Sequence, residues 1–467
     1  MTRHDGAGPG VPHARRSGHR DPRHHLPHHV LLSAVLAVIV GLSAAIYLAV
    51  DAGDGGRLGQ ESLASSRTGP HSAAAPSTGV WVGSWAAAPV GSEPLTEREG
   101  TAGRTVRNVV HTSVGGTSAR ITLSNLYGTG ALTVTSVTLA VAAGDDSPAA
   151  DPGTLRRLTF GGRPAISIPA GEQAVSDAVP LAVPRDTDVL VSLYTPTSAG
   201  PVTFHHLAQQ TSYVADGEHT ADVTGTPYTG QSTYWRYLTA LDVLSEEADG
   251  TVVAFGDSIT DGFASTPGAN RRWPDVLADR LHASLTDGDD APDYGVVNAG
   301  ISGNRVLTGG PGRPAGNPSG LDRFDRDVLG RPNVKVVVID LGVNDILRSQ
   351  NTADPDAVLD GLRDLVRRAH AHGIKAVGTT LLPFRGHHGY TDAREDVRRR
   401  INAEIRSGSV YDTLVDVDRA MHDPYDPRRL KAEYDSGDHL HPSDRGYWKM
   451  AQLIRWSQLT GAGRADL

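Results

Sequence analysis

Four short polar segments in the second half of the chain contain residue types that together could cleave an ester. They are Gly256-Asp257-Ser258, Ser302-Gly303-Asn304, Gly342-Val343-Asn344-Asp345 and Asp438-His439-Leu440-His441. Ser258 offers a hydroxyl nucleophile, His441 a base to activate it, and Asp438 a carboxylate to orient that base. The backbone N–H groups of Ser258 and Gly303 and the side-chain amide of Asn344 could bind the oxyanion of a tetrahedral intermediate. This set of groups is complete for acyl transfer.

The first three segments each follow a short apolar run that could form a buried strand. These runs are Val252–Phe255, Tyr294–Val297 and Val336–Leu341. The fourth segment lies just before the helix expected near the C-terminus. Ligands of open α/β sheets bind at the carboxyl ends of the strands. We therefore expect one sheet edge to bring the four segments together.

The fourth segment offers more than one histidine and more than one aspartate. His439 is directly beside Asp438, but adjacent side chains diverge, whereas a three-residue loop can return a carboxylate to an imidazole. The sequence therefore favours His441 as the base and His439 as a surface residue. Asp435 is the alternative to Asp438 as the orienting carboxylate.

Each proposed catalytic residue also has an ordinary structural interpretation. A serine after a strand is often a helix N-cap, a lone glycine a turn residue and a lone asparagine a turn cap. The presence of all four segments favours catalytic roles for Ser258, Gly303 and Asn344. Asp261 could serve either purpose. We interpret three further polar residues as structural, tying loops to backbone amides: Asp257, Asn304 and Asp345.

These segments resemble the four sequence blocks of the SGNH or GDSL esterases and lipases. The resemblance extends over roughly residues 252–459, with all blocks present in the family's order. It implies a flavodoxin-like three-layer α/β/α hydrolase domain, placed here at residues 248–462, which needs no metal or organic cofactor. It also implies a Ser258-His441-Asp438 triad and an oxyanion hole formed by Ser258, Gly303 and Asn344.

The periodicity of residues 248–462 agrees with an α/β domain. Apolar residues at helical spacing predict helices, and short apolar runs predict strands between them. The predicted helices are Trp273–His282, Ala357–His372, Asp392–Ser407 and Ser443–Thr460, and further strands are Ile374–Leu382 and Leu414–Val417. Strands that alternate with helices imply a parallel sheet covered on both faces.

Residues 80–247 instead predict an all-β, sandwich-like accessory domain. Short alternating runs are separated by turn residues, without a convincing amphipathic helix. A change of phase after Val134 suggests a β-bulge at Thr135-Ser136. The runs Trp81–Trp85 and Leu123–Gly128 resemble the β-domain that precedes the catalytic domain in an arylesterase-like branch of the family.

The role of this accessory domain stays open at this stage. Trp81, Trp85 or Trp235 could stack on a polysaccharide, or they could be core residues of a structural domain that packs against the hydrolase. The second interpretation is favoured. A third possibility is that one of its loops lines the acyl pocket.

The N-terminal segments predict export. Residues 1–30 are polar and rich in arginine and histidine, which is typical of a disordered cytoplasmic tail. Residues 31–50 are uncharged and long enough for a transmembrane helix, although a cleaved signal sequence is the alternative. Residues 51–79 are rich in Gly, Ser, Ala and Pro, as in a flexible linker. The catalytic part is thus expected outside the cell, tethered to the membrane or secreted.

Composition excludes several other functions. The net charge of −9 gives no basic surface for nucleic acid, and the absence of cysteine excludes disulfides and thiolate chemistry. A metal-dependent hydrolase is disfavoured because no compact His/Asp ligand spacing accompanies the four segments.

The sequence therefore predicts an exported serine esterase for carboxylic esters, with short-chain or carbohydrate-linked acyl groups favoured. The alternatives are a lipase or phospholipase for long acyl chains, a carbohydrate deacetylase, and a non-catalytic surface protein that binds carbohydrate. The glycine- and proline-rich loop Thr308–Gly320 follows the oxyanion glycine, so we expect it to influence acyl or alcohol selectivity. Activity should fall as His441 becomes protonated.

Overall fold

The structure is a computed structural model that describes residues 79–309, 317–350, 352–461 and 463 of the chain. These residues fall within one compact unit. The predicted cytoplasmic tail, the membrane or signal segment at 31–50 and nearly all of the linker lie outside them. No helix in the described part of the chain is long and apolar enough to cross a membrane.

A five-stranded parallel sheet forms the centre of the C-terminal half. Its strand order is β18-β17-β19-β20-β21, so in chain order the strands lie as 2-1-3-4-5. That is the flavodoxin-like order, whose ligand site lies where the strand order reverses, beside the first strand. The strands are β17 (Gly250–Gly256), β18 (Tyr294–Gly300), β19 (Val334–Asp340), β20 (Lys375–Thr379) and β21 (Thr413–Val415).

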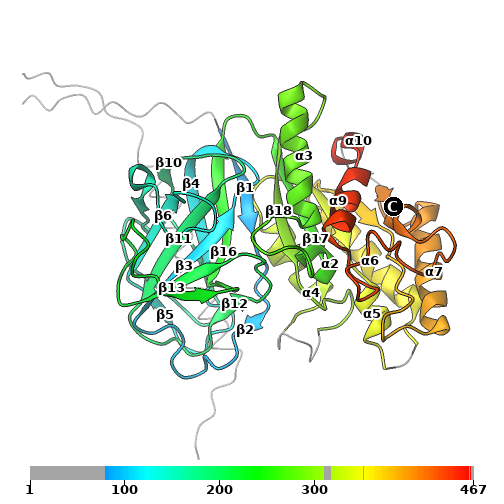
Figure 1. The fold of residues 1–467 in the computed structure, drawn as a ribbon, viewed down its shortest axis with the longest axis horizontal. Coiled ribbons are helices and arrows are strands. Elements are labelled where there is room, and N and C mark those ends of the chain that lie inside the picture. Colours follow the sequence, from blue (N-terminus) through cyan, green and yellow to red (C-terminus); the bar gives the residue numbers. More distant parts are fainter. Residues whose placement is uncertain (1–78, 310–316, 351, 462, 464–467) are drawn as a thin grey trace, which may run out of the picture. The chain divides into compact units, whose positions relative to one another are not determined.

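Helices cover both faces of this sheet, which gives the three-layer arrangement that the sequence predicted (Figure 1). On one face α6 (Pro355–His370) and α7 (Asp392–Ser407) bury Leu362 and Ile401 against Phe255 and Ile339. On the other face α3 (Trp273–Asp287) and α9 (Asp444–Leu453) pack against the alternate strand residues, Val252 and Val338 among them. The remaining helical segments are α2 (Ser258–Asp261), α4 (Gly320–Phe324), a π-helical turn at Asp325–Leu329, α5 (Val343–Leu347), α8 (Val417–Met421) and α10 (Trp456–Leu459).

The single C-terminal helix predicted at Ser443–Thr460 is wrong, because α9 ends at Leu453 and α10 begins at Trp456. The guanidinium of Arg280 on α3 donates hydrogen bonds to the carbonyls of Ala451 and Ile454 at this break. These carbonyls are therefore satisfied without a continuing helix.

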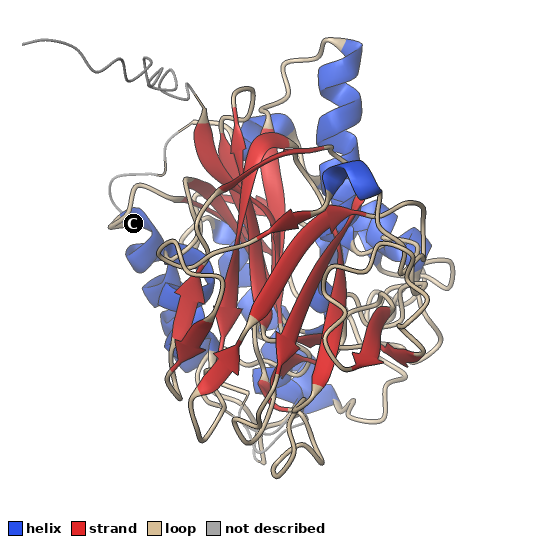
Figure 2. Cartoon of the chain, turned by 90° about the vertical axis from the view of Figure 1, so that its left-hand side faces the viewer, coloured by secondary structure: helices blue, strands red, loops and turns tan. Residues whose placement is uncertain are grey.

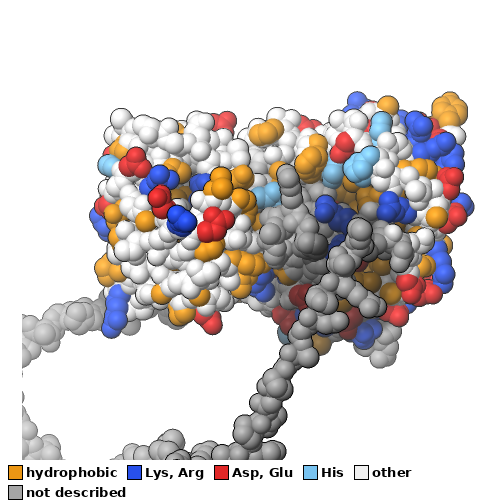
Figure 3. Space-filling view, turned by 90° about the horizontal axis from the view of Figure 1, so that it is seen from below, with side chains coloured by type: hydrophobic (Ala, Val, Ile, Leu, Met, Phe, Trp, Pro, Cys, Tyr) orange, Lys and Arg blue, Asp and Glu red, His pale blue; other side chains and the backbone are white. Residues whose placement is uncertain are grey.

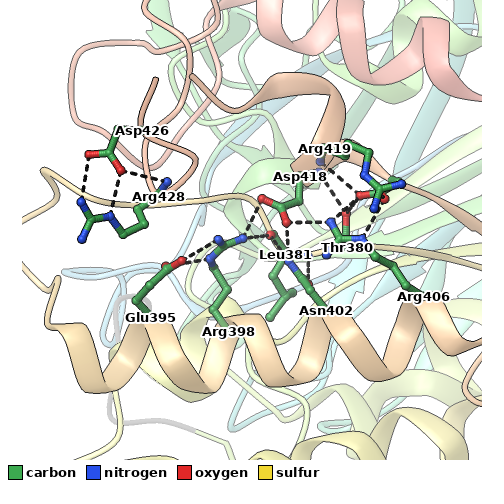
Figure 4. Close-up of polar contacts among 11 residues, drawn as sticks. Thr380, Leu381, Glu395, Arg398, Asn402, Arg406, Asp418, Arg419, Asp426 and Arg428 are labelled. Carbon is green, nitrogen blue, oxygen red and sulfur yellow. Dashed lines mark hydrogen bonds and ion pairs between the residues drawn. The ribbon is translucent and has the colours of Figure 1, made fainter. Parts of the chain in front are cut away.

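Helix α7 carries a buried charged residue that its amphipathic pattern does not reveal. The Arg398 side chain is 3 % exposed and pairs with Glu395 and Asp418, each at 2.8 Å (Figure 4). It also donates to the carbonyl of Leu381 at 2.8 Å, just after β20. Arg398 thus anchors the start of the loop between β20 and α7, which continues to the histidines at 387 and 388.

The N-terminal half of the described chain is all-β apart from one 3-10 turn at Pro152–Thr154. Two antiparallel sheets lie face to face (Figure 2), and their inner residues, such as Ile121 and Val243 from one and Val106 and Val191 from the other, share one core. One sheet contains β1 (Val80–Ala86), β16 (Leu238–Ser245), β4 (Gly116–Ser124), β10 (Val179–Val183) and β9 (Gln173–Val175). The other contains β14 (Gly230–Ser232), β13 (Ser212–Asp216), β3 (Arg104–His111), β11 (Asp188–Thr195), β6 (Ser136–Val141) and β7 (Arg156–Arg157). Two small sheets complete the region: β15 (Trp235–Arg236), β12 (Thr203–His205) and β2 (Gly91–Ser92), and β5 (Leu132–Val134) with β8 (Ile166–Ile168).

The strand pairing and the burial of the tryptophans test two expectations for the β region. The phase change near Thr135 is not a bulge, because the chain leaves β5 in one sheet and enters β6 in another. Trp85 and Trp235 are 4 % and 1 % exposed and meet edge to face at 4.8 Å. They are core residues, as the favoured interpretation held, so neither offers a ring for stacking on a polysaccharide. Trp81 is half-buried, with Arg120 over its ring.

The β region packs directly against the parallel sheet. A Cβ on Gly295 of β18 would lie 2.2 Å from the carbonyl oxygen of Gly83 on β1, so only glycine permits this approach. The N–H of Gly83 donates to Thr251 Oγ1 at 2.9 Å, and the N–H of Val296 donates to Ser113 Oγ at 2.9 Å. The accessory region is therefore joined to β17 and β18 of the parallel sheet by hydrogen bonds.

Candidate active site

The proposed nucleophile lies at the carboxyl end of β17, the first strand of the parallel sheet. The chain turns sharply there, since a Cβ on Gly256 would lie 2.2 Å from Thr260 Oγ1. Asp257 is the N-cap of α2 and accepts a hydrogen bond from the N–H of Ile259 at 3.0 Å. Ser258 is therefore the first residue of the helix and not its cap, and its hydroxyl is free for another partner.

That partner is His441, whose Nε2 lies 2.8 Å from Ser258 Oγ. The other ring nitrogen, Nδ1, lies 2.5 Å from Asp438 Oδ2. Asp438 also accepts hydrogen bonds from the N–H groups of His441 and Leu440, at 2.8 and 2.9 Å. Partial burial would raise the pKa of Asp438, but these bonds outweigh it and hold the pKa well below the usual range. The ionised carboxylate then fixes Nδ1–H, which leaves Nε2 to accept the serine proton.

The rival residues form a pair of their own in the same turn. His439 Nδ1 lies 2.6 Å from Asp435 Oδ2, and its side chain is 46 % exposed. The backbone of His439 has a φ of +65°, in the left-handed region. His439 and Asp435 thus stabilise the turn and do not contact Ser258.

Ser258 and Asn344 line one cavity, and Gly303 lies against Arg348, another residue of its lining. No hydrogen bond in the described part of the chain uses the N–H of Ser258 or of Gly303, so both remain free to donate. Asn344 Nδ2 donates one hydrogen to Asp257 Oδ2 at 3.1 Å, which leaves its second hydrogen available. Gly303 has a φ of +78°, a conformation that favours glycine.

Arg348 orients this group of donors, although the sequence analysis did not identify it. Its Nε donates to Asn344 Oδ1 at 3.1 Å, which fixes the amide with Nδ2 toward Asp257. Its guanidinium also lies against Gly303, where a Cβ would be 2.7 Å from Nη2. No sequence pattern indicates this role, because an arginine after a short helix is an ordinary surface residue.

A second arginine, Arg323, joins the segment around Ser258 to the segment around Gly303 through buried hydrogen bonds. Arg323 is fully buried and donates to the carbonyls of Gly256 and Ala299 at 2.8 and 2.7 Å. It also donates to Asn304 Oδ1 at 2.9 Å. Burial lowers the pKa of Arg323 to about 10, even with Asp327 beside it, so it keeps its charge at neutral pH.

Asp261, whose role the sequence left open between catalytic and structural, forms an ion pair with a histidine of the β region. His205 of β12 places Nε2 2.9 Å from Asp261 Oδ1 and Nδ1 2.7 Å from the carbonyl of Ala88. Both partners are acceptors, so both ring nitrogens carry hydrogen and His205 is an imidazolium. The other carboxylate oxygen of Asp261 accepts from the N–H and the hydroxyl of Ser302, at 2.9 and 2.7 Å. Asp261 thereby links the nucleophile helix, the loop before Gly303 and the β region.

Gln209 adds a second connection from the β region. Its side-chain amide donates to the carbonyls of Gly262 and Ser265 at 3.1 and 2.6 Å, and its backbone carbonyl accepts from the N–H of Gly268 at 2.8 Å. The segment that follows the nucleophile helix is thus fixed by a residue that lies outside the proposed hydrolase domain.

The three residues interpreted as structural do join loops. Asp257 caps α2, and Asp345 accepts from the N–H groups of Val306 and Leu307 at 2.8 and 3.2 Å. Burial nevertheless raises the pKa of Asp345 to about 6. Asn304 mainly donates, through Nδ2 to Asn317 Oδ1 at 2.7 Å, so it uses side-chain contacts where backbone amides were expected.

The candidate site opens into a cavity of about 780 Å³. Its walls come from the nucleophile turn, the end of α5, the loop before α7 and the turn before α9. The lining residues are Ser258, Phe263, Asn344, Leu347, Arg348, Gly386–Gly389 and Gly437–His441. Phe263 packs over the His441 ring, with ring centres 4.4 Å apart. Residues 310–316 of the loop expected to influence selectivity lie outside the described part, so that expectation stays a prediction.

Among the described residues, no group of three or more His, Cys, Asp or Glu side chains is placed to hold a metal ion. The histidines of the cavity are instead paired with aspartates or with one another, as His387 and His388 are, with ring centres 4.0 Å apart.

The family of the C-terminal half follows from comparison with known proteins. Residues 254–449 match the model of the GDSL-like lipase/acylhydrolase family. These residues form a GDSL-like lipase/acylhydrolase domain. The GDSL-like domain includes all four polar segments, the whole triad-like arrangement and Arg348. No curated protein matches the chain.

Several solved structures are similar to the chain. A GDSL-like lipase from Bacteroides thetaiotaomicron VPI-5482 is 23 % identical, with a TM-score of 0.31, over 44 % of this chain and 87 % of that one. A carbohydrate acetylesterase from Sinorhizobium meliloti is 17 % identical, with a TM-score of 0.33, over 43 % and 94 %. A family two carbohydrate esterase from Clostridium thermocellum, solved with cellohexaose, is 16 % identical, with a TM-score of 0.33, over 81 % and 93 %.

Proposed function

We propose that the chain is a serine ester hydrolase that acts through an acyl-enzyme. The observation that carries this proposal is the continuous hydrogen-bond chain from Ser258 Oγ through His441 to Asp438. His441 Nε2 removes the serine proton as Oγ attacks the ester carbonyl, and Asp438 stabilises the imidazolium. The oxyanion binds to the N–H groups of Ser258 and Gly303 and to Asn344 Nδ2.

The same groups complete the reaction. His441 returns the proton to the leaving alcohol as the tetrahedral intermediate collapses to an ester of Ser258. Water then attacks this ester, with His441 as the base, and the acid is released while Ser258 recovers its proton. The cycle consumes one water and yields one acid and one alcohol, and no other reactant is needed.

The lining of the cavity favours substrates with short acyl groups or polar alcohols over substrates with long lipid chains. Apart from Phe263, Leu347 and Leu440, its lining consists of polar, charged or glycine residues. A long acyl chain needs a largely apolar slot, because each CH₂ gains about 0.8 kcal/mol only when it leaves water. We therefore place a lipase or phospholipase behind a short-chain or carbohydrate-linked esterase.

Hydrolysis of p-nitrophenyl esters from acetyl to palmitoyl by the purified protein tests both points. Activity should peak at short chains and should be lost in Ser258→Ala and in His441→Ala. His439→Ala is the matched control, since that histidine lies in the same turn without contact to the serine. Equal activity in Ser258→Ala and the parent would overturn the serine mechanism, and a maximum at palmitoyl would favour the lipase. Absence of hydrolysis with the fold intact would favour a carbohydrate-binding protein without catalysis.

We also propose that the enzyme acts outside the cell, tethered through residues 31–50 or released after their cleavage. Support comes from the sequence alone, in its uncharged run after an arginine-rich segment. Protease treatment of intact cells should remove the catalytic part from the cell-bound protein or find it already in the medium. Full protection until the cells are lysed would contradict this location.

A further inference from the structure

The cavity beside Ser258 holds one permanent charge that the catalytic cycle does not use. Among its lining residues, Asp438 is committed to His441, and His439 is paired with Asp435. Burial and the neighbouring His388 lower the pKa of His387, so that imidazole is neutral at pH 7. The remaining charge is the guanidinium of Arg348, an exposed side chain that forms no ion pair among the described residues.

The position of this guanidinium is fixed by the oxyanion hole itself. Nε is held by Asn344 Oδ1 at 3.1 Å, and Nη2 rests against the α-carbon of Gly303. The planar group therefore stands at the rim of the site, with donors left over to face the cavity. A guanidinium in this state matches a carboxylate geometrically, since it can donate two parallel hydrogen bonds.

The face that Figure 3 shows carries both acidic and basic side chains over its described surface, with several Lys and Arg side chains together at the right-hand edge. The chain as a whole carries a net charge of −9. Selection of an anionic substrate would therefore come from the cavity and not from long-range attraction.

We propose that Arg348 selects esters that carry a carboxylate close to the scissile bond. This assignment rests on the proposed esterase function and names the substrate class of the same site. The carboxylate can belong to the acyl group, as in a monoester of a dicarboxylic acid, or to the alcohol, as in an acylated hydroxy acid or uronic acid. In either case the guanidinium binds the substrate and, through Asn344, also holds the oxyanion amide.

Two pairs of esters separate these cases. For the acyl side, the p-nitrophenyl monoester of succinate is compared with p-nitrophenyl butyrate, which has the same chain length without the charge. For the alcohol side, 4-acetoxybenzoate is compared with its methyl ester. The measured quantity is the ratio of kcat/KM for the anionic ester to that for its neutral match, because damage to the oxyanion hole alone lowers both values together.

In the pair that fits the site, Arg348→Gln should lower this ratio about fivefold to tenfold, as expected for one charge pair close to solvent. Arg348→Lys should keep the ratio within about threefold of the parent, although both rates fall because Nε no longer holds Asn344. Arg399→Gln is the matched control, since Arg399 is an exposed arginine of α7 that lines a different cavity. Added salt should lower the ratio of the parent and leave that of Arg348→Gln unchanged.

Unchanged ratios for both pairs in Arg348→Gln would overturn the assignment, as would an equal fall in Arg399→Gln. A failure of the underlying esterase is distinguishable from this. If the parent cleaves none of the four esters, or if Ser258→Ala cleaves them equally well, the esterase proposal falls and the assignment of Arg348 falls with it. If the neutral esters are cleaved in a Ser258-dependent way and the ratio of kcat/KM values is the same in Arg348→Gln as in the parent, only the assignment of Arg348 falls.

Discussion

Replacement of His205 should reveal whether the β region acts on the catalytic centre. His205 and Asp261 are 4 % and 2 % exposed, so removal of either partner leaves a buried, uncompensated charge. Such losses cost about 3–5 kcal/mol of unfolding free energy. His205→Asn should suffer this loss, because its short amide can still reach the carbonyl of Ala88 but not Asp261. His205→Gln is the matched variant, since its longer amide can still donate to Asp261 and should cost about 1–2 kcal/mol.

The catalytic effect should follow the same order. Asp261 holds Ser302, the residue before Gly303, through two hydrogen bonds. Without His205, the unpaired carboxylate of Asp261 is expected to rotate toward water. The loop that carries the Gly303 N–H then loses its fixed position. We expect kcat to fall about tenfold or more in His205→Asn, with a smaller change in KM, because an oxyanion donor acts mainly in the transition state. His205→Gln should recover much of this loss.

The dependence of stability on pH gives an independent check. Burial and nearby Arg272 lower the pKa of His205, but the charge and hydrogen bond of Asp261 outweigh them and the pKa is raised. Its contribution is therefore full below about 6.5, the ordinary histidine value, and is lost as pH rises through the raised pKa. Burial raises the pKa of Asp261, but His205 outweighs it and the pKa is lowered. That contribution is present above about 3.9 and is lost as pH falls through the lowered pKa.

Urea unfolding and steady-state kinetics test both effects together. The difference in unfolding midpoint between the parent and His205→Asn should be largest between about pH 4 and pH 6.5 and should shrink toward alkaline pH. A midpoint that His205→Asn leaves unchanged would refute the ion-pair reasoning. A lower midpoint with the kcat of the parent would show that the pair joins the two regions without positioning the oxyanion loop.

Three further predictions concern the GDSL-like domain. Gly303→Ala should lower kcat about 100-fold, because a φ of +78° is strained for alanine and the new Cβ meets the neighbouring guanidinium. Gly373→Ala is the control: its φ is +69°, a Cβ there would meet nothing within 4 Å, and the change should lower only the stability. Asp438→Asn should reduce kcat by about 100-fold or more, and Asp435→Asn by far less, as measured on a short-chain ester. The fragment 248–467 should be inactive or insoluble, because it exposes the sheet edge that the β region covers; full activity of that fragment would contradict the contacts described above.

The sequence predicted the elements that depend on local pattern. The helix at Asp392–Ser407 occurs with those bounds, and the sheet is parallel, as the alternation of strands and helices predicted. The placement of Ser258 beside His441 was also accessible, since both lie at the carboxyl edge of one sheet. The break between Leu453 and Trp456 was not, because it depends on hydrogen bonds from Arg280, a residue of another helix. Local periodicity contains no information about such a partner.

The supporting residues of the site were hidden for the same reason. His205, Gln209, Arg323 and Arg348 belong to no motif. The first three acquire their roles through contacts with residues more than fifty positions away along the chain, whereas Arg348 contacts Asn344, four residues before it, and also Gly303. His205 and Gln209 precede Ser258 by about fifty residues and belong to a region of different fold. A domain boundary drawn at residue 248 from the change in periodicity necessarily assigned them elsewhere.

That boundary separates two folds but cuts through one functional arrangement. The buried imidazolium of His205 neutralises Asp261, and Asp261 in turn holds the loop that carries Gly303, the proposed oxyanion donor. Gln209 fixes the chain on the other side of the nucleophile helix. A domain that merely delivered the enzyme to a polysaccharide would need neither contact, and a binding surface would keep its tryptophans exposed, whereas Trp85 and Trp235 are core. The β region is therefore best understood as a structural support of the proposed active site, and its loss should affect kcat before it affects any affinity for polymer.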